Sequence, residues 1–259
     1  MYLEEILARH RAAASADPRD PEALCARAAA SPATRGFAAR LRADAQVALA
    51  VIAEVKRRSP SRGPIVPDLD PASVAAQYAR GGASCLSVLT DAEGFGGSPA
   101  DLAAARAATD LPVLRKDFTV DVRDVYDARI MGADAVLLIA AALDAPSLGR
   151  CLAAAVDVGL DALVEVHDGD ELAAALDAGA TMVGVNQRDL RTFEVDPGRA
   201  AALASRMPDD VLRVAESGVR TADDARALRA CGYHAVLVGE GVVASADRAA
   251  AVAALRVGA

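Results

Sequence analysis

The sequence VIAEVKRRSPSRG at residues 51–63 sets the pattern that the rest of the chain repeats. It begins as an apolar, β-branched run, which is typical of a strand buried on both faces. Side chains alternate along a strand, so Glu54 and Lys56 point to the same side, opposite Val55. Unpaired charges are costly to bury, and a basic loop follows at once. A strand that ends in charge and leads into an anion-friendly loop indicates a site at its carboxyl end.

Strand-like and helix-like segments alternate from about residue 47 to the C-terminus. Glycines at helix ends and capping residues such as Ser98, Asp196 and Thr221 at helix starts support the boundaries. The predicted strands are Ala48–Lys56, Cys85–Thr90, Pro112–Lys116, Ala135–Ala140, Ala162–Val166, Met182–Asn186, Val211–Glu216 and Ala235–Gly239. The predicted helices are Pro71–Arg80, Pro99–Thr109, Val122–Met131, Ala145–Val158, Gly169–Ala178, Pro197–Arg206, Ala222–Ala230 and Asp247–Arg256.

Eight strands alternating with eight helices predict an α/β fold, the (β/α)8 TIM barrel. The alternative is an open doubly wound sheet, which would usually carry a glycine-rich turn after its first strand. Here that turn is rich in arginine and serine. Residues 1–46 show no strand pattern, and we expect a helical N-terminal extension on the outside or across one end. The 259 residues suit a single domain, with the barrel over 47–259.

Composition excludes several classes of function. The net charge is −8, Trp is absent and Phe and Tyr number four each, so a nucleic-acid partner is not expected. The four cysteines and three histidines are scattered, which favours reduced thiols in a cytoplasmic protein over a zinc site or disulfides. No apolar run reaches the ~18 residues of a membrane span, and the first residues lack a signal-peptide pattern. We expect a monomer or a weak homo-oligomer.

Charged and amide side chains stand at the carboxyl ends of five predicted strands, where the active sites of such barrels lie. Alternation places each on the face of the residue two positions earlier, so these groups are expected to share one barrel mouth. A lysine close to carboxylates perturbs their pKa values, which provides an acid and a base near neutral pH. The six residues are Glu54, Lys56, Lys116, Glu165, Asn186 and Glu216.

A phosphate site is predicted where the last two strands end. Ser217 and Gly218 follow the seventh strand, and residues 239–241, Gly-Glu-Gly, follow the eighth. Small residues leave backbone N–H groups accessible there, and a short helix beginning near Glu240 would present its N-terminus. Lys56 on the neighbouring first strand would add a positive charge.

Two loops offer groups for a flat, acidic ring. Phe95 lies between glycines after the second strand, where it either plugs the packing or stacks on a substrate ring. After the sixth strand, Arg188 offers a guanidinium for a carboxylate, and Leu190 stands beside it.

These residues resemble the indole-3-glycerol-phosphate synthase family of tryptophan biosynthesis. The matching segments follow the family's order over nearly the whole chain, and the helical N-terminal extension also fits. The segments are IAEVK at 52–56 with SPS at 59–61, LSVLT at 86–90, LRKDF at 114–118, LVEVH at 163–167, VNQRDL at 185–190, AESG at 215–218 and VGE at 238–240.

The resemblance implies a lyase that closes the pyrrole ring of 1-(2-carboxyphenylamino)-1-deoxyribulose 5-phosphate and releases carbon dioxide and water. Lys116 would protonate the ketone as the ring carbon attacks it, and Glu165 would act as acid and base in the dehydration. No metal or organic cofactor is implied, because rearomatisation suffices for the decarboxylation. The other implied roles are assistance by Lys56 and Asn186, positioning by Glu54 and Glu216, phosphate binding by Lys56, Ser217, Gly218, Gly239 and Glu240 (through backbone groups), and contact with the anthranilate part by Ser59, Phe95, Arg188 and Leu190.

Two departures from the family pattern and two alternatives remain. Gly94 stands where members often carry a second aromatic, and residues 241–243, Gly-Val-Val, replace a small residue followed by Leu-Met. One alternative is an Amadori isomerase of an N-aryl aminosugar phosphate, which would use a cysteine and an aspartate. Cys85, however, begins a predicted strand and does not end one. The other alternative is a phosphosugar-binding module without catalysis.

Overall fold

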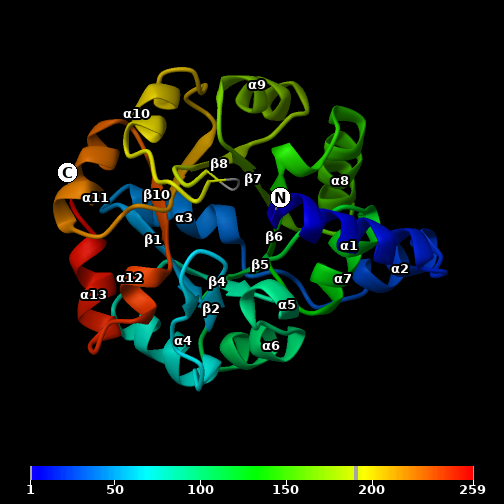
Figure 1. The fold of residues 1–259 in the computed structure, drawn as a ribbon, viewed down its shortest axis with the longest axis horizontal. Helices are drawn as coiled ribbons and strands as arrows, with labels where there is room; N and C mark the ends of the chain where they lie inside the picture. Colours follow the sequence, from blue (N-terminus) through cyan, green and yellow to red (C-terminus); the bar gives the residue numbers. More distant parts are fainter. Residues whose placement is uncertain (1, 190–191, 259) are drawn as a thin grey trace.

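Eight parallel strands close into a barrel in the computed structural model, which describes residues 2–189 and 192–258 (Figure 1). Strand β1 pairs with both β4 and β10, and this pairing closes the ring. The predicted TIM-barrel fold is therefore confirmed. The barrel strands are β1 (Ala50–Val55), β4 (Cys85–Leu89), β5 (Val113–Lys116), β6 (Ala135–Ile139), β7 (Asp161–Val166), β8 (Met182–Asn186), β9 (Leu212–Glu216) and β10 (Ala235–Val238).

Helices follow the strands and cover the outside of the barrel (Figure 1). Ser98 and Thr221 cap α6 and α11 as predicted, since each side chain accepts a hydrogen bond from a backbone N–H of the first turn. The helices are α4 (Pro71–Arg80), α5 (Ala92–Phe95), α6 (Pro99–Ala107), α7 (Val122–Ile130), η1 (Ala140–Ala142), α8 (Ala145–Asp157), α9 (Gly169–Asp177), α10 (Gly198–Ala204), α11 (Ala222–Ala230), α12 (Glu240–Val243) and α13 (Arg248–Leu255).

One predicted cap is wrong. Helix α10 begins at Gly198, and Pro197 is its N-cap residue without a side-chain hydrogen bond. The Asp196 carboxylate instead accepts from the Gly198 N–H at 2.9 Å. Its short side chain closes a local turn ahead of the helix, which competes with the capping geometry.

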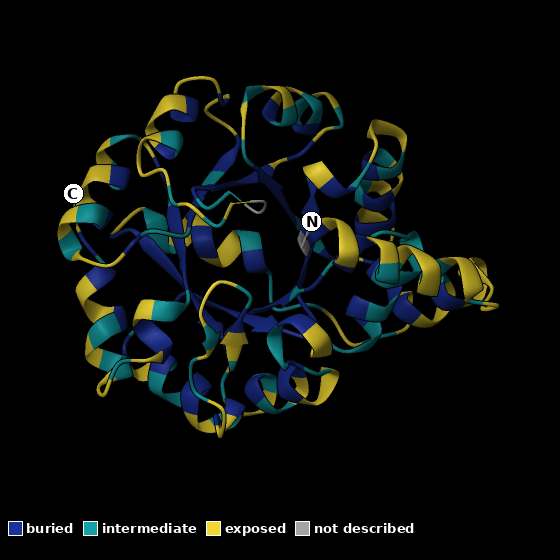
Figure 2. Cartoon of the chain, viewed as in Figure 1, coloured by how far each residue is buried: buried dark blue, intermediate teal, exposed yellow. Residues whose placement is uncertain are grey.

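Alternation along each strand divides the core into two layers. Ala50 and Ile52 of β1 belong to a cluster inside the barrel, whereas Val51, Ala53 and Val55 join the cluster between strands and helices. Most residues of the barrel strands are buried, and the surrounding helices are exposed mainly on their outer faces (Figure 2). The inner rows begin apolar at the amino ends of the strands, so their polar members gather at the carboxyl ends.

Two of the N-terminal helices, α1 and α3, lie at opposite ends of the barrel. Phe37 and Leu41 of α3 (Phe37–Ala45) are fully buried in the cluster inside the barrel. The N-terminus of α3 is fixed by Asp161 at the start of β7, which accepts from the Ala38 N–H at 2.8 Å. Helix α1 (Tyr2–Ala16) lies across the carboxyl end, where Leu3 joins the same cluster (Figure 1). Helix α2 (Pro21–Ala29) packs beside α7 on the outside.

The basic segment after β1 is an ordered hairpin of β2 (Arg58–Ser59) and β3 (Gly63–Pro64). Arg57 ties this hairpin to α6 through an ion pair with Asp101, with one contact of 2.9 Å. Its guanidinium also donates to the Leu69 and Gly96 carbonyls. Arg57 therefore holds the hairpin in place and is not available to a ligand. Within residues 2–189 and 192–258, no helix combines the length and apolarity needed to cross a membrane.

Candidate active site

One pocket opens at the carboxyl end of the barrel. Every predicted site residue that the structure describes lines it, including all six polar groups at the strand ends. Leu190 lies outside the described residues. The spatial grouping expected from strand alternation is thus present, while the individual chemical roles stay predictions.

Lys116 lies at the centre of the polar groups. Its Nζ is 3.1 Å from Glu165 Oε2 and 3.9 Å from Glu216 Oε2. Asn186 Nδ2 donates to the other Glu165 oxygen at 3.1 Å, and Asn186 Oδ1 accepts from the Arg188 N–H. Three strands, β5, β7 and β8, therefore fix one ammonium and one carboxylate in contact.

Burial and charge set the protonation of these groups. Burial by itself lowers the pKa of Lys116, but three carboxylates, led by Glu165, outweigh it and raise that pKa. Burial raises the pKa of Glu165, yet Lys116 and His167 lower it to about 2. For Glu216, burial and the charge on Glu165 both raise the pKa well above its usual range. In the substrate-free site these effects favour the charged forms of Lys116 and Glu165 and the neutral form of Glu216.

The Glu216 carboxylate has room inside the barrel because a glycine of the neighbouring strand β8, Gly184, lies beside it. A Cβ placed on Gly184 would lie 2.1 Å from Glu216 Oε1. That oxygen is buried and has no hydrogen-bond partner among the described residues. A glycine at this position therefore keeps space for a carboxyl group beside Lys116.

Lys56 forms a second ion pair next to the predicted phosphate site. Its Nζ lies 2.6 Å from Glu54 Oε1, which confirms that the two side chains share a face. A Cβ placed on Gly239 would lie 3.0 Å from the same Nζ. The Lys56 ammonium thus lies against the backbone at the end of β10, where a phosphate was expected to bind.

The turn after β9 has an unusual backbone. Ser217 and Gly218 both have positive φ, 66° and 78°, and such strain in a non-glycine residue clusters at functional sites. Gln187 Nε2 donates to the Ser217 carbonyl at 2.8 Å and so fixes the turn. Opposite it, the predicted short helix is present as α12, beginning at Glu240.

The Glu240 carboxylate and the Arg188 guanidinium are partly engaged in the substrate-free protein. Ser59 Oγ donates to Glu240 Oε1 at 3.3 Å, and Arg188 Nη2 and Arg62 Nη1 each lie 3.6 Å from a Glu240 oxygen. Arg188 also donates to the Phe193 carbonyl at 3.1 Å. The carboxylate therefore joins three loops around the mouth, a role that sequence reasoning missed.

Aromatic and apolar side chains that sequence reasoning missed complete the wall. Phe118 packs against Phe95 with ring centroids 6.2 Å apart, and both line the pocket. Phe118 directly follows the LRKD segment, a signal that was present in the sequence. Phe95 lies in the one-turn helix α5 and not in an irregular loop. Leu3 and Ile6 of α1 also line the pocket, although nothing in their local sequence shows that α1 crosses the barrel.

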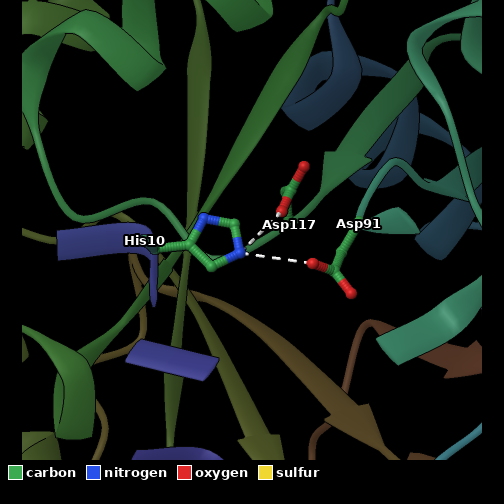
Figure 3. A group of neighbouring side chains, drawn as sticks. All are labelled: His10, Asp91 and Asp117. Carbon is green, nitrogen blue, oxygen red and sulfur yellow. Dashed lines mark hydrogen bonds and ion pairs between the residues drawn. The ribbon is translucent and has the colours of Figure 1, made fainter. Parts of the chain in front are cut away.

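His10, Asp91 and Asp117 hold α1 over the mouth (Figure 3). His10 Nε2 lies 3.2 Å from Asp91 and 4.0 Å from Asp117. Both aspartates also accept hydrogen bonds from arginines: Arg9 contacts Asp91 at 2.6 Å and Arg115 contacts Asp117 at 3.0 Å. This ion-pair network attaches the helix to the barrel, and we assign no metal to it.

Comparison with known proteins identifies the family. The profile of the family described as indole-3-glycerol phosphate synthase matches residues 3–255. The chain belongs to that family. Its relatives include Indole-3-glycerol phosphate synthase 2 of Streptomyces coelicolor, 54% identical over 220 residues that span 85% of this chain and 84% of the relative. The indole-3-glycerol phosphate synthase of Chlorobium phaeovibrioides is 48% identical over 248 residues, 95% of this chain and 96% of the relative.

Solved structures resemble this member of the indole-3-glycerol phosphate synthase family in fold. A 3-hexulose-6-phosphate synthase superposes with a TM-score of 0.62 at 19% identity, over 80% of this chain and 98% of that one. Thiamine phosphate pyrophosphorylase from Pyrococcus furiosus superposes with a TM-score of 0.60 at 18% identity, over 80% of this chain and 93% of that one. These similarities show the barrel fold alone. For the isomerase alternative, no cysteine among the described residues lines the pocket, and Cys85 is buried at the amino end of β4.

Proposed function

We propose that this chain is itself an indole-3-glycerol phosphate synthase, which converts 1-(2-carboxyphenylamino)-1-deoxyribulose 5-phosphate into indole-3-glycerol phosphate, carbon dioxide and water. The observation that carries the proposal is the contact of Lys116 with Glu165 and Glu216 inside one pocket. The turns that we propose as the phosphate site and the Phe95–Phe118 pair line the same pocket.

Lys116 is the acid of the ring-closing step. When the anthranilate ring carbon attacks the ketone, negative charge develops on the ketone oxygen, and a placed ammonium stabilises and protonates it. The chain has only two lysines, Lys56 and Lys116, and both line the pocket. All other strong bases are arginines, which do not give up a proton in proteins. The protein thus has lysine where proton transfer is needed.

Glu165 serves the later steps. Loss of the substrate carboxylate as carbon dioxide restores the aromatic ring, and the remaining hydroxyl must then leave as water. A carboxyl group near that hydroxyl protonates it on departure and, as a carboxylate, accepts the proton released when the pyrrole ring forms. Asn186 holds Glu165 in place at 3.1 Å. Glu54 and Glu216 orient the lysines and the sugar hydroxyls.

Binding uses the rest of the pocket. Backbone N–H groups of the turns at residues 217–218 and 239–240, with the Lys56 ammonium, hold the phosphate. Ser59 and Phe95 face the anthranilate ring, and the expected contact of Leu190 lies outside the described residues. Arg188 binds the substrate carboxylate. To do so, its guanidinium gives up the long contact with the Glu240 carboxylate. A short salt bridge to a substrate is stronger than a 3.6 Å contact, so the exchange favours binding.

The domain organisation, cellular location and oligomeric state belong to the same proposal. We propose one catalytic domain that acts in the cytoplasm as a monomer or a weak homo-oligomer, with a phosphorylated small molecule as its partner. Support comes from the pocket, which α1 and the barrel strands line together within a single chain.

The test is product formation from the proposed substrate, followed by indole absorbance. Lys116→Ala and Lys116→Arg are each expected to lower turnover by roughly 10²–10⁴-fold. Arginine keeps the charge but donates no proton, so it separates acid catalysis from charge alone. Binding of inorganic phosphate should survive in both variants, because the cradle lies on other strands.

Arg226→Ala is the matched control, because it removes an exposed base on α11 that pairs with the exposed Asp223, away from the pocket. It should retain the wild-type rate. A wild-type protein that binds phosphate but forms no product would favour the non-catalytic module, and full activity in Lys116→Arg would remove Lys116 as the acid.

A further inference from the structure

The proposed reaction consumes one proton in each turnover. Two protons are added to the ketone oxygen, which leaves as water, and one returns from the carbon beside the nitrogen when the pyrrole forms. The electron pair of the departing carboxylate stays in the ring. The substrate therefore loses one negative charge and takes up one proton, which must reach the reacting groups from solution.

A substrate in the pocket would cover the direct path from the mouth to Glu165. Glu165 is 1% exposed, and Lys116 faces the space that the substrate would fill. The Lys116 ammonium, 3.1 Å from Glu165, favours the ionised carboxylate, so Glu165 needs a proton before it can act as an acid. A proton source on the side of Glu165 away from the substrate would meet this need.

His167 lies on that side. Its Nε2 is 3.7 Å from Glu165 Oε1, and this buried nitrogen has no hydrogen-bond partner among the described residues. Its Nδ1 lies 3.1 Å from Glu171 Oε2, and the same oxygen accepts from the His167 N–H at 2.7 Å. Neither His167 nor Glu171 lines the pocket. The Glu171 side chain is 23% exposed at the start of α9, so Glu171 and His167 together connect solution to the buried Glu165.

The groups around His167 favour its charged form. The carboxylates of Glu165 from β7 and Glu171 from α9 face the ring, and Arg199 from α10 opposes them. Burial lowers the pKa of His167, but the Glu171 hydrogen bond and the two carboxylate charges raise it above its ordinary value. The imidazolium then has an N–H directed at each carboxylate. At 3.7 Å the contact with Glu165 is an ion pair, and catalytic contacts often shorten in the substrate complex.

We propose that His167 and Glu171 form a proton relay that resupplies Glu165 from solution during the reaction. The His167 Nε2–H bond breaks as an O–H bond forms on Glu165, which leaves a neutral ring with its remaining proton at Nδ1 beside Glu171. The ring then turns about its Cβ–Cγ bond, which carries the bare Nε2 into the former position of Cε1, next to the Glu171 carboxylate. Glu171 passes a proton from solution to Nε2, and the reverse turn brings the new N–H back to Glu165. His167 acts through Glu165 and is thus a positioning residue for the proton. The inference rests on the proposed function.

Two substitutions separate proton supply from packing. His167→Asn keeps a hydrogen-bonding group near Nδ1 for Glu171, and His167→Gln keeps an amide donor near Nε2 for Glu165. Neither side chain ionises, so each variant is expected to lower kcat by roughly 10²-fold with an unchanged KM. Added imidazole should restore part of the rate in His167→Asn. Full kcat in His167→Gln would mean a structural role and would overturn the relay.

Glu171→Gln provides the second readout. Loss of the carboxylate lowers the pKa of His167, so the fall of kcat at high pH should move to lower pH. The control is His234→Asn at the amino end of β10, where Nδ1 accepts from the Arg213 N–H and Asn retains an acceptor. Its rate, pH profile and lack of response to imidazole should match wild type.

The two proposals fail in different ways. A wild-type protein that forms no indole product overturns the proposed function. An active wild type whose pH profile superimposes on that of Glu171→Gln overturns the relay alone.

Discussion

At the scale of single residues, the site depends on where side chains are absent as much as on where they are present. Glu216 occupies space that any side chain at Gly184 would fill, and a side chain at Gly239 would meet the Glu54 carboxylate and then the Lys56 ammonium. Protein interiors are close-packed, so an added methyl group must displace the polar side chain that it meets. Lys116 would then lose part of its fixed environment.

Gly184→Ala is expected to lower kcat about 10²-fold, because displacement of a catalytic group by about 1 Å has an effect of this size. The measurement is steady-state turnover, together with thermal unfolding. Gly149→Ala in α8 is the control, since nothing lies within 4 Å of a Cβ at that position. It should keep full activity and gain up to about 1 kcal/mol of stability. Equal rates for the two variants would contradict the prediction.

At the scale of elements, α1 is a part of the active site that is attached by charge. Asp91 accepts hydrogen bonds from Arg9, His10 and the Gly94 N–H, so it joins α1 to α5 and the end of β4. Burial raises the pKa of Asp91, but these partners, led by His10 and Arg9, lower it to about 2. A carboxyl group whose pKa is lowered by folding stabilises the protein above its unfolded pKa, about 3.9.

Asp91→Asn should therefore lower the free energy of unfolding by about 1–3 kcal/mol at neutral pH. The difference from wild type should shrink as the pH falls from about 4 towards about 2, because Asp91 becomes protonated in the folded state. Urea unfolding at several pH values measures it. Asp209→Asn serves as control, because that carboxylate is fully exposed. A difference that stays constant down to pH 2 would show that the charge of Asp91 is unimportant.

At the scale of the whole molecule, the two ends of the barrel have different tasks. The amino end is closed by α3, whose Phe37 is fully buried in the inner cluster, and the carboxyl end carries the pocket. Closure and substrate binding are separated to opposite ends of the barrel, so residues of the pocket can change without loss of the core.

Phe37→Ala is expected to lower the free energy of unfolding by about 3–5 kcal/mol, from lost burial and the cavity that remains. The kcat of the folded protein at low temperature should stay near wild type, because Phe37 does not line the pocket. Phe37→Leu should lose less stability, since it fills most of the same space. A large fall in kcat for folded Phe37→Ala would show that the two ends are coupled.

Local sequence predicted a large part of this protein. The order of strands and helices, the inward side of each strand and the polar residues at strand ends all follow from short-range periodicity. The structure departs from the expectations where side chains find distant partners. Arg57 was read as part of an anion-binding loop, yet its guanidinium holds Asp101 and two carbonyls.

The sequence alone determined which residues alternate inward and therefore which six polar groups share a face, because a strand repeats every two residues whatever surrounds it. Only the tertiary structure decided that α1 covers the mouth, that Glu240 joins three loops and that His167 lies between Glu165 and Glu171. These contacts depend on closure of the barrel, which brings together segments far apart in the chain, and their geometry is not encoded in any one segment.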